Sequence, residues 1–394
     1  MLSYEDALSR ILGAAQPLPA ERTSLANAGG RTLAEPILAA FDQPPFRASA
    51  MDGYAVRWSD LPGPWRQIGE SAAGKPFRGT LKAGETVRIF TGAPVPEAAD
   101  TVIIQEDMET GAGGAVELHG DGPPAIGAHI RPRGNDFNAG ATLLEVGTRL
   151  TPPALALAAA AGAAHLATHR PPRIAIIATG DELVPPGTPA GPGQIVGSSG
   201  VMIAEQLRRA GATVDDFGIV PDDRTAIATA ISKAAGHDLV ITIGGASVGD
   251  HDLVKDALAA AGAEIDFWRI AIRPGKPLIH GRLGSAHFIG LPGNPVSAFI
   301  CTRLFAVPLV LRLSGAEPRD HLRTARLTVP LPPNGGRRDH MRAVQSDDRI
   351  APLSMQDSSQ LRALTQANAL IVREPHAHAA EAGDTVHFIP LDSA

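Results

Sequence analysis

The sequence predicts an α/β plus β protein of several domains: a three-layer α/β domain, a β-rich inserted module and a C-terminal β-barrel-like domain. Apolar runs alternate with helical patterns over residues 171–315, which is typical of a mostly parallel sheet covered on both faces. Short apolar runs between Gly- and Pro-bearing turns fill residues 41–145 and 316–394, as in small β modules. The length of 394 residues suits two to four domains.

The N-terminal part predicts a helical linker domain made of residues 1–40 and 146–170. Apolar residues at helical intervals after Ser3 indicate a helix over residues 4–12. Pro152-Pro153 opens an alanine-rich helix to about residue 164, and Pro171-Pro172 marks a boundary. The β-rich module lies between the two halves of this linker. Its clearest expected strands are residues 86–90 and 101–105.

The α/β domain and the C-terminal domain follow in order. In the helix expected over residues 200–210, Val201, Ile203, Ala204 and Leu207 are placed on the inward face. The other expected α/β helices are 222–235, 253–261 and one from about 294. The expected strands of this domain are 174–178, 213–219, 239–243, 265–272 and 287–291. The strands expected in the C-terminal domain are 323–330, 341–345, 370–373 and 385–390.

Composition excludes several classes of protein. A formal net charge of −6 disfavours a non-specific nucleic-acid binder. The single cysteine, Cys301, excludes an internal disulfide framework and a cysteine-based zinc cluster. The start of the chain lacks a signal-peptide pattern, and Arg303, Pro308 and Arg312 interrupt the apolar run at 296–313. We therefore expect a cytoplasmic protein with no nucleic-acid or membrane partner.

Glycines and acidic residues collect in four loops that directly follow predicted strands. Glycines let backbone N–H groups approach an anion, and a helix N-terminus adds a favourable dipole. Glu182, Asp222 and Asp252 stand beside these loops, and such carboxylates suit a phosphoanhydride only when a hard cation such as Mg²⁺ lies between them. Taken singly, each loop is more often a tight turn or a helix cap than a phosphate site. Their coincidence favours a nucleotide-like ligand. The loops are 179–183, 220–223, 244–250 and 290–297.

Three cations lie close together in the segment from residue 269 to 277. Along an extended chain Arg269 and Arg273 share one face, and Lys276 follows a Pro-Gly turn. These cations either bind an anion or form an ordinary solvated basic edge.

Several long motifs resemble the molybdopterin molybdotransferase family, the bacterial molybdenum insertases similar to the E domain of gephyrin. The resemblance runs over essentially the whole chain. The matching strings are Ser-Ala-Met-Asp-Gly-Tyr-Ala (49–55), Arg-Ile-Phe-Thr-Gly-Ala-Pro-Val-Pro (88–96), Arg-Gly-Asn-Asp (133–136), Gly-Gly-Ala-Ser-Val-Gly-Asp (244–250), Arg-Pro-Gly-Lys-Pro (273–277) and Gly-Leu-Pro-Gly-Asn-Pro-Val-Ser (290–297).

The resemblance implies insertion of molybdate into adenylylated molybdopterin, with release of AMP and molybdenum cofactor, assisted by Mg²⁺ or alternatively Zn²⁺. It implies a homodimer whose cleft joins the β-rich module of one subunit to the α/β domain of the other. Molybdopterin adenylyltransferase and molybdoenzyme apo-proteins are further partners of this chemistry. Asp52, Thr91 and Asp136 match catalytic positions of the family. Glu182, Asp222 and Asp252, beside the strand-end loops, are the further catalytic candidates and the expected metal ligands. Implied cofactor-binding positions are Gly244, Gly245, Ser247, Gly249, Arg269, Arg273, Lys276, Pro292, Gly293, Asn294, Ser297, Arg337 and Ser358.

The chain departs from the family pattern at three places. Gly197-Ser198-Ser199 stands where the family usually has Asp-Ser-Asn, arginines stand at 269 and 273 where lysine is usual, and the glycines around Ser358 are missing. Arginine keeps the charge but offers a bidentate fork in place of a point charge. Two rival functions stay open: a molybdopterin adenylyltransferase, which the large inserted module disfavours, and a non-catalytic molybdopterin-binding scaffold or carrier.

Overall fold

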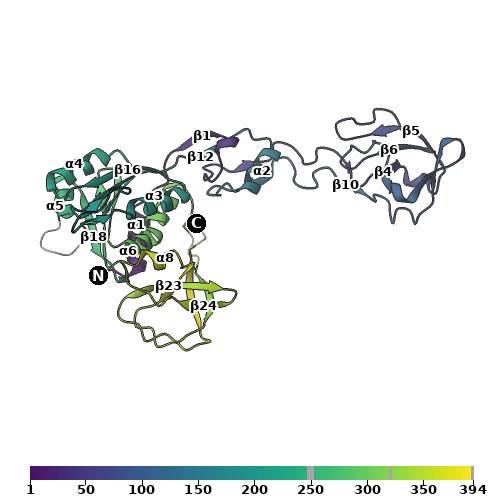
Figure 1. The fold of residues 1–394 in the computed structure, drawn as a ribbon. Helices are drawn as coiled ribbons and strands as arrows, with labels where there is room; N and C mark the ends of the chain where they lie inside the picture. Colours follow the sequence, from purple (N-terminus) through teal and green to yellow (C-terminus); the bar gives the residue numbers. More distant parts are fainter. Residues whose placement is uncertain (246–252, 319–321, 392–394) are drawn as a thin grey trace.

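The computed structural model describes residues 1–245, 253–318 and 322–391. Figure 1 shows an elongated molecule in which the α/β domain and the C-terminal domain lie together at one end. A narrow linker joins them to the β-rich module at the opposite end. The multidomain α/β plus β fold predicted from the sequence is confirmed.

The centre of the α/β domain is a mixed sheet in the order β16-β13-β17-β21-β20-β18. The first four strands run parallel, and β20 and β18 are antiparallel to their neighbours. β13 and β17 are almost fully apolar and buried, as expected for strands covered on both faces. The strands are β13 (Arg173–Thr179), β16 (Thr213–Val220), β17 (Leu239–Ile243), β18 (Glu264–Arg269), β20 (Pro277–Leu283) and β21 (Ala286–Leu291).

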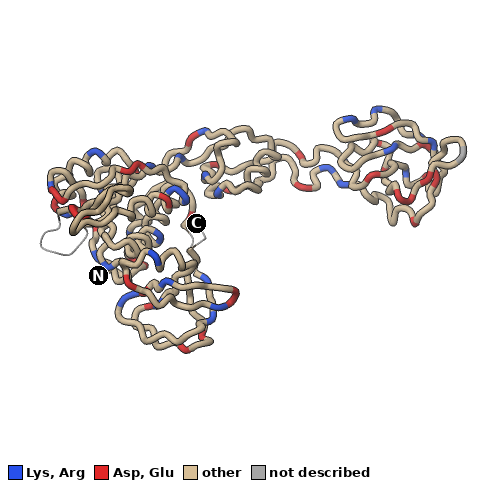
Figure 2. The backbone as a smooth tube through the Cα atoms, in the orientation of Figure 1, with Lys and Arg blue, Asp and Glu red and all other residues tan. Residues whose placement is uncertain are grey.

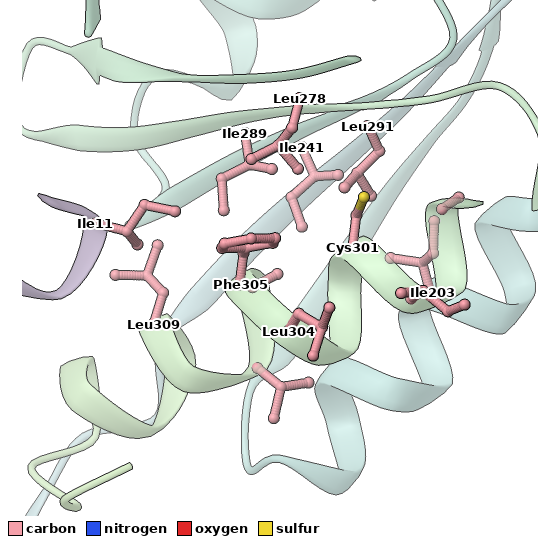
Figure 3. Close-up of a cluster of buried hydrophobic side chains, with 14 of the residues drawn as sticks. Ile11, Ile203, Ile241, Leu278, Ile289, Leu291, Cys301, Leu304, Phe305 and Leu309 are labelled. Atoms are coloured by element: carbon pink, nitrogen blue, oxygen red, sulfur yellow. The ribbon is translucent and has the colours of Figure 1, made fainter. Parts of the chain in front are cut away.

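Helices cover both faces of this sheet and complete three layers. On one face α1, α3 and the α6–α7 helix pack against the sheet, with Ile203, Ile241, Cys301 and Phe305 at the centre of the core (Figure 3). On the other face α4 and α5 bury their own apolar sides. The helices are α1 (Tyr4–Gly13), α3 (Ser199–Arg209), α4 (Arg224–Ala234), α5 (Leu253–Ala260), α6 (Pro295–Cys301), the π-helical turn η5 (Thr302–Ala306) and α7 (Val307–Leu313).

The α6–α7 helix explains the apolar run near residue 300. The segment Pro295–Leu313 is long and apolar enough to cross a membrane by length and composition alone. Inside the protein, however, 72% of it is buried against the sheet and its neighbours. It is therefore the central core helix of the α/β domain.

The structure differs from the expected elements at four points. Ser3 caps α1 as expected, but the helix packs into the α/β core rather than with the linker. Val201 is 62% exposed, since the first turn of α3 faces a pocket and not the core. The alanine-rich helix α2 ends at Ala160 and is followed by a strand. β20 was not expected, because it begins at a proline directly after a turn.

The C-terminal domain is a small closed barrel. Strands β23, β24, β22, β26 and β25 pair in sequence, and β25 pairs back with β23. The strand β19 (Ile272–Arg273), which comes from the α/β segment, adds to the edge of β23 and joins the two domains. The remaining elements are β22 (Arg323–Leu327), β23 (Arg338–Ser346), β24 (Arg349–Pro352), α8 (Leu361–Leu364), β25 (Ala369–Arg373) and β26 (Thr385–Pro390).

The chain passes through the linker twice, once on its way to the β-rich module and once on its return to the α/β domain. In the linker, β1 pairs antiparallel with β12 and β2 with β11. The module carries a sheet in the order β7-β4-β6-β5-β9-β8. The linker elements are β1 (Ala20–Ser24), η1 (Leu25–Asn27), β2 (Ile37–Leu38), β11 (Thr142–Leu144), α2 (Pro152–Ala160) and β12 (His165–His169). The module elements are β3 (Ala48–Ser49), β4 (Gly53–Val56), η2 (Trp58–Asp60), β5 (Trp65–Ser71), β6 (Glu85–Ile89), β7 (Thr101–Ile104), η3 (Gln105–Asp107), β8 (Met108–Thr110), η4 (Ala112–Gly114), β9 (Ala115–Leu118) and β10 (Ile130–Arg131).

Charges of both signs are interspersed over every part of the molecule. Figure 2 shows Lys and Arg alternating with Asp and Glu along the α/β domain, the linker, the module and the barrel. Along the drawn backbone of the described residues, Lys and Arg do not form one unbroken run.

Candidate active site at the strand ends

A pocket of about 880 Å³ lies at the carboxyl ends of the parallel strands. It falls within the size range of small-molecule sites, and its place is where open α/β sheets bind ligands. The loops after β13, β16, β17 and β21 all contribute to it, so the four loops singled out in the sequence do converge. Its predicted members are Glu182, Asp222, Gly244, Gly245, Pro292, Gly293 and Asn294.

Two glycines after β17 allow this convergence. Gly244 and Gly245 have φ values of 93° and 63°, which side-chain-bearing residues rarely adopt. A Cβ at Gly244 would lie 2.6 Å from the carbonyl oxygen of Thr179, and a Cβ at Gly245 would lie 2.1 Å from Cγ2 of Val254. The loop therefore passes so close to β13 and α5 that only glycine fits.

Thr179 places a polar group in the pocket wall. Its side chain is 3% exposed, and Oγ1 has no hydrogen-bond partner among the described residues. A buried hydroxyl without a partner costs free energy, and a ligand oxygen or nitrogen in the pocket would satisfy it.

Acidic groups gather at one side of the pocket. Asp181 Oδ1 accepts a hydrogen bond of 3.0 Å from the backbone N–H of Asp222, and Glu182 lines the same pocket. Partial burial raises the pKa of Asp222 above its ordinary value, and the charges of Asp181 and Glu182 raise it further. A hydrogen bond from Asp181 offsets part of this pKa shift. A cation at this position would relieve the repulsion.

The described donor atoms in the pocket fit a divalent cation that takes its remaining ligands from a substrate. Within residues 1–245, 253–318 and 322–391, no group of three His, Cys, Asp or Glu side chains is arranged to hold a metal ion. Three carboxylates of the described residues line the pocket, namely Glu182, Asp216 and Asp222, and Mg²⁺ in phosphate sites is commonly held by one or two carboxylates plus substrate oxygens. The third expected ligand, Asp252, lies outside the described residues, as do Ser247 and Gly249.

The remaining predicted residues of the last strand loop connect the pocket to the C-terminal domain. Asn294 Nδ2 donates to Ser358 Oγ over 3.1 Å, and Val296 N donates to Ser358 O. Ser358 therefore lies at the pocket edge although it belongs to the barrel segment. Ser297 is buried inside α6 and does not line the pocket.

The three cations of residues 269–276 are not drawn together around the pocket. β18 ends at Arg269, whereas Arg273 belongs to β19 and forms an ion pair with the buried Asp339 of β23. The extended segment expected to align Arg269 and Arg273 is therefore broken between two sheets. Lys276 is exposed and directly precedes Pro277, which does line the pocket.

Four predicted site residues lie away from this pocket within the chain. Asp52 and Thr91 are exposed on the β-rich module, where Asp52 Oδ1 accepts a 2.7 Å hydrogen bond from Thr91 N. Asp136 is exposed at the neck between linker and module, and its N–H donates to Gln43 O. Arg337 lies partly exposed just before β23.

An apolar wall of the pocket was not predicted. Ile195, Val196 and Val201 are largely exposed and line the pocket next to the neutral Gly197-Ser198-Ser199 turn. The sequence does contain a signal for this apolar wall, because Val201 lies in the first turn of a helix that follows a polar loop. Ser359 and Leu361 line the pocket from the barrel side.

Fold and site define a class: a multidomain α/β protein with a ligand pocket at the strand ends and a β-rich module inserted in an N-terminal linker. The chain matches models described as the MoeA N-terminal region (domain I and II) over residues 2–162, "Probable molybdopterin binding domain" over 175–312 and the MoeA C-terminal region (domain IV) over 324–391. The chain belongs to the MoeA family of molybdopterin molybdenumtransferases.

Individual relatives agree over nearly their full length. The Haemophilus influenzae molybdopterin molybdenumtransferase is 36% identical, with 100% of this chain and 99% of that protein covered. Molybdopterin molybdenumtransferase 2 of Mycobacterium tuberculosis is 35% identical, with 93% of each covered. A crystal structure of the molybdopterin biosynthesis moeA protein from Pyrococcus horikoshii OT3 superposes with a TM-score of 0.85 at 26% identity, covering 98% of this chain and 99% of that one.

Proposed function

We propose that this protein inserts molybdate into adenylylated molybdopterin in molybdenum cofactor biosynthesis. Water cleaves the phosphoanhydride of the substrate, so that AMP leaves and the other phosphate stays on molybdopterin. Molybdate exchanges oxygen ligands, which leave as water, for the two dithiolene sulfurs. The single observation that carries the proposal is the pocket, which combines paired carboxylates, glycine loops and an apolar wall at the strand ends. A ligand with a charged phosphoanhydride and a planar ring needs these three kinds of surface together.

Each part of the pocket has a task in this proposal. Gly244, Gly245 and Gly293 line the pocket without side chains, so the phosphate groups would approach their backbone. Glu182 and Asp222, with Asp252, would hold Mg²⁺, which supplies charge neutralisation at the phosphates when bound. The apolar wall of Ile195, Val196 and Val201 would exclude water from one face of the ring.

Two copies of the chain complete the site in this proposal. Asp52, Thr91 and Asp136 belong to or adjoin the module, which Figure 1 places at the far end of the same chain. They reach a strand-end pocket only when the module of a second copy lies against it. A homodimer with two composite clefts therefore fits the elongated shape.

The direct test incubates the purified protein with adenylylated molybdopterin, molybdate and Mg²⁺, and measures AMP and molybdenum cofactor. We expect AMP release that depends on molybdate and is strongly reduced in Asp222→Asn. Release no greater than in a reaction without protein would contradict the proposal. Consumption of ATP with molybdopterin alone would support the rival adenylyltransferase, and tight binding without AMP release would support the rival scaffold.

A further inference from the structure

Arg88 belongs to the β-rich module, which also carries Asp52 and Thr91. It lies in β6, where it pairs in register with Tyr54 of β4. Its guanidinium carbon is 4.9 Å from the ring centre of Tyr54 and 5.1 Å from that of Phe90. Arginine stacks well on aromatic faces, so these two rings fix the plane of the guanidinium.

The same guanidinium joins separate segments of the chain. Nη1 donates to Gly53 O over 3.1 Å, and Nη2 donates to Gln105 Oε1 over 2.5 Å. Gly53 directly follows Asp52 in sequence, and Phe90 directly precedes Thr91. The N–H of Gln105 also donates to Asp52 O over 3.0 Å. One side chain therefore contacts the immediate neighbours of both Asp52 and Thr91.

The geometry leaves little freedom for alternative packing at this point. A Cβ at Gly53 would lie 1.9 Å from the carbonyl oxygen of Ile103, so β4 and β7 approach as closely as glycine allows. Both hydrogen-bond acceptors of Arg88 are neutral. The arginine therefore acts here through its fork of donors and its stacking and not through an ion pair with either acceptor.

We propose that Arg88 is a positioning residue that holds Asp52 and Thr91 in one fixed geometry for the reaction. The inference rests on the proposed function, in which the Asp52–Thr91 pair of one subunit meets the pocket of the other. Small displacements of groups that face a reacting substrate cost large factors in rate, whereas substrate binding is less affected.

The experiment uses the full-length protein and four single variants: Arg88→Gln, Arg88→Lys, Asp52→Asn and the control Arg66→Gln. Arg66 lies in the same module, where it is largely exposed and paired with Glu85. We expect Arg88→Gln to lower kcat by about 10- to 100-fold with KM changed by less than about threefold. Arg88→Lys should have a kcat close to that of Arg88→Gln, because lysine lacks the planar fork of donors.

A double variant separates positioning from simple damage to the fold. If Arg88 acts through Asp52, then adding Arg88→Gln to Asp52→Asn should cost less than about threefold further, because coupled residues are non-additive. An equal fold-loss in both backgrounds would overturn the proposal.

Amide hydrogen exchange gives a readout that does not depend on activity. The Thr91 N–H is held by Asp52 Oδ1, so we expect its exchange to accelerate at least about tenfold in Arg88→Gln and not in Arg66→Gln. Unchanged Thr91 exchange would also overturn the proposal. If the wild-type protein releases no AMP, the proposed function fails, and this exchange measurement still decides whether Arg88 holds the pair.

Discussion

Single residues decide whether the strand-end pocket exists at all. Gly244 is the clearest case, since its backbone has a left-handed φ and lies against the carbonyl of Thr179. A side chain at this point meets backbone, which cannot move away without opening the sheet. The close approach of β13 and β17 is therefore a condition of the pocket's shape.

We expect Gly244→Ala to lower the free energy of unfolding by about 2 kcal/mol or more, because it adds both backbone strain and a clash. Thermal or urea unfolding of the purified variant measures this. Gly236→Ala is the matched control, because a Cβ there meets no atom within 4 Å and φ is ordinary. Equal stability of the two variants would contradict this account of the loop.

The pKa of Asp222 is raised by folding, whereas the pKa of a carboxylate in a structural ion pair is usually lowered. Because its pKa is raised in the folded protein, the charged form is less favourable there than in the unfolded chain, and this penalty applies above the ordinary pKa of Asp. We expect Mg²⁺ to raise the Tm of the wild type, and we expect Asp222→Asn to raise Tm slightly at pH 7 without Mg²⁺ and to abolish the response to Mg²⁺. The control is Asp223→Asn, because asparagine can still cap α4 by accepting the hydrogen bond from Ala226 N. This variant should change neither the Tm without Mg²⁺ nor the response of Tm to Mg²⁺. A lower Tm for Asp222→Asn would count against the cation site.

At the scale of elements, the strand β19 joins the α/β domain to the barrel. Its Arg273 pairs with Asp339 of β23, which is 5% exposed, and this carboxylate is the main reason that the pKa of Arg273 is raised. The Arg273 guanidinium is therefore already paired within the fold. An oxyanion that bound to Arg273 would have to share this guanidinium with Asp339.

Removing Arg273 should leave a buried carboxylate without its partner. We expect Arg273→Met to lower the free energy of unfolding by about 1–3 kcal/mol. Addition of Asp339→Asn should restore part of this loss, since the buried charge is then gone. The exposed pair of Arg209 and Glu205 supplies the control, in which Arg209→Met should change stability by less than about 0.5 kcal/mol. Chemical denaturation measures all four proteins.

The contact between α1 and β23 predicts acid sensitivity. His340 is buried beside Tyr4, and burial, with the charge of Arg338, lowers the pKa of His340 to about 3. The unfolded chain takes up a proton near pH 6.5 and the folded protein does not, so stability falls as the pH drops from about 6.5 toward 3. We expect a shallower fall in His340→Leu than in wild type or in the exposed-site control His387→Leu. Parallel Tm-versus-pH curves would refute this.

The sequence predicts those elements whose signal is local. β17 is found at the expected residues, because an apolar run of this length between turns is too short for a helix and predicts a buried strand. The four pocket loops were also predictable, since the carboxyl ends of parallel strands meet at one edge. β19 and the α1 packing were not, because both depend on pairing with segments far away in the chain. Val201 was misplaced because helical periodicity alone does not tell a core from a pocket.

At the scale of the whole molecule, the extended linker separates two sets of functional candidates. Glu182 and Asp222 lie in the α/β pocket, and Asp52 and Thr91 lie on the module at the opposite end (Figure 1). In the function proposed above, a second copy of the chain would bring both sets to one substrate. The family resemblance predicts such a composite cleft, and the separation gives it a physical reason.

The most direct measurement mixes two variants, each impaired in a different half of the proposed composite site. Asp52→Asn and Asp222→Asn are each assayed alone for AMP release, then combined 1:1 after subunit exchange confirmed by mass spectrometry of the intact assembly. A composite site predicts strongly reduced but measurable activity for each alone and recovery of about a quarter of wild-type activity in the mixture, because half the dimers carry one intact cleft. No recovery despite proven mixed dimers would contradict the central claim that two subunits share each active site.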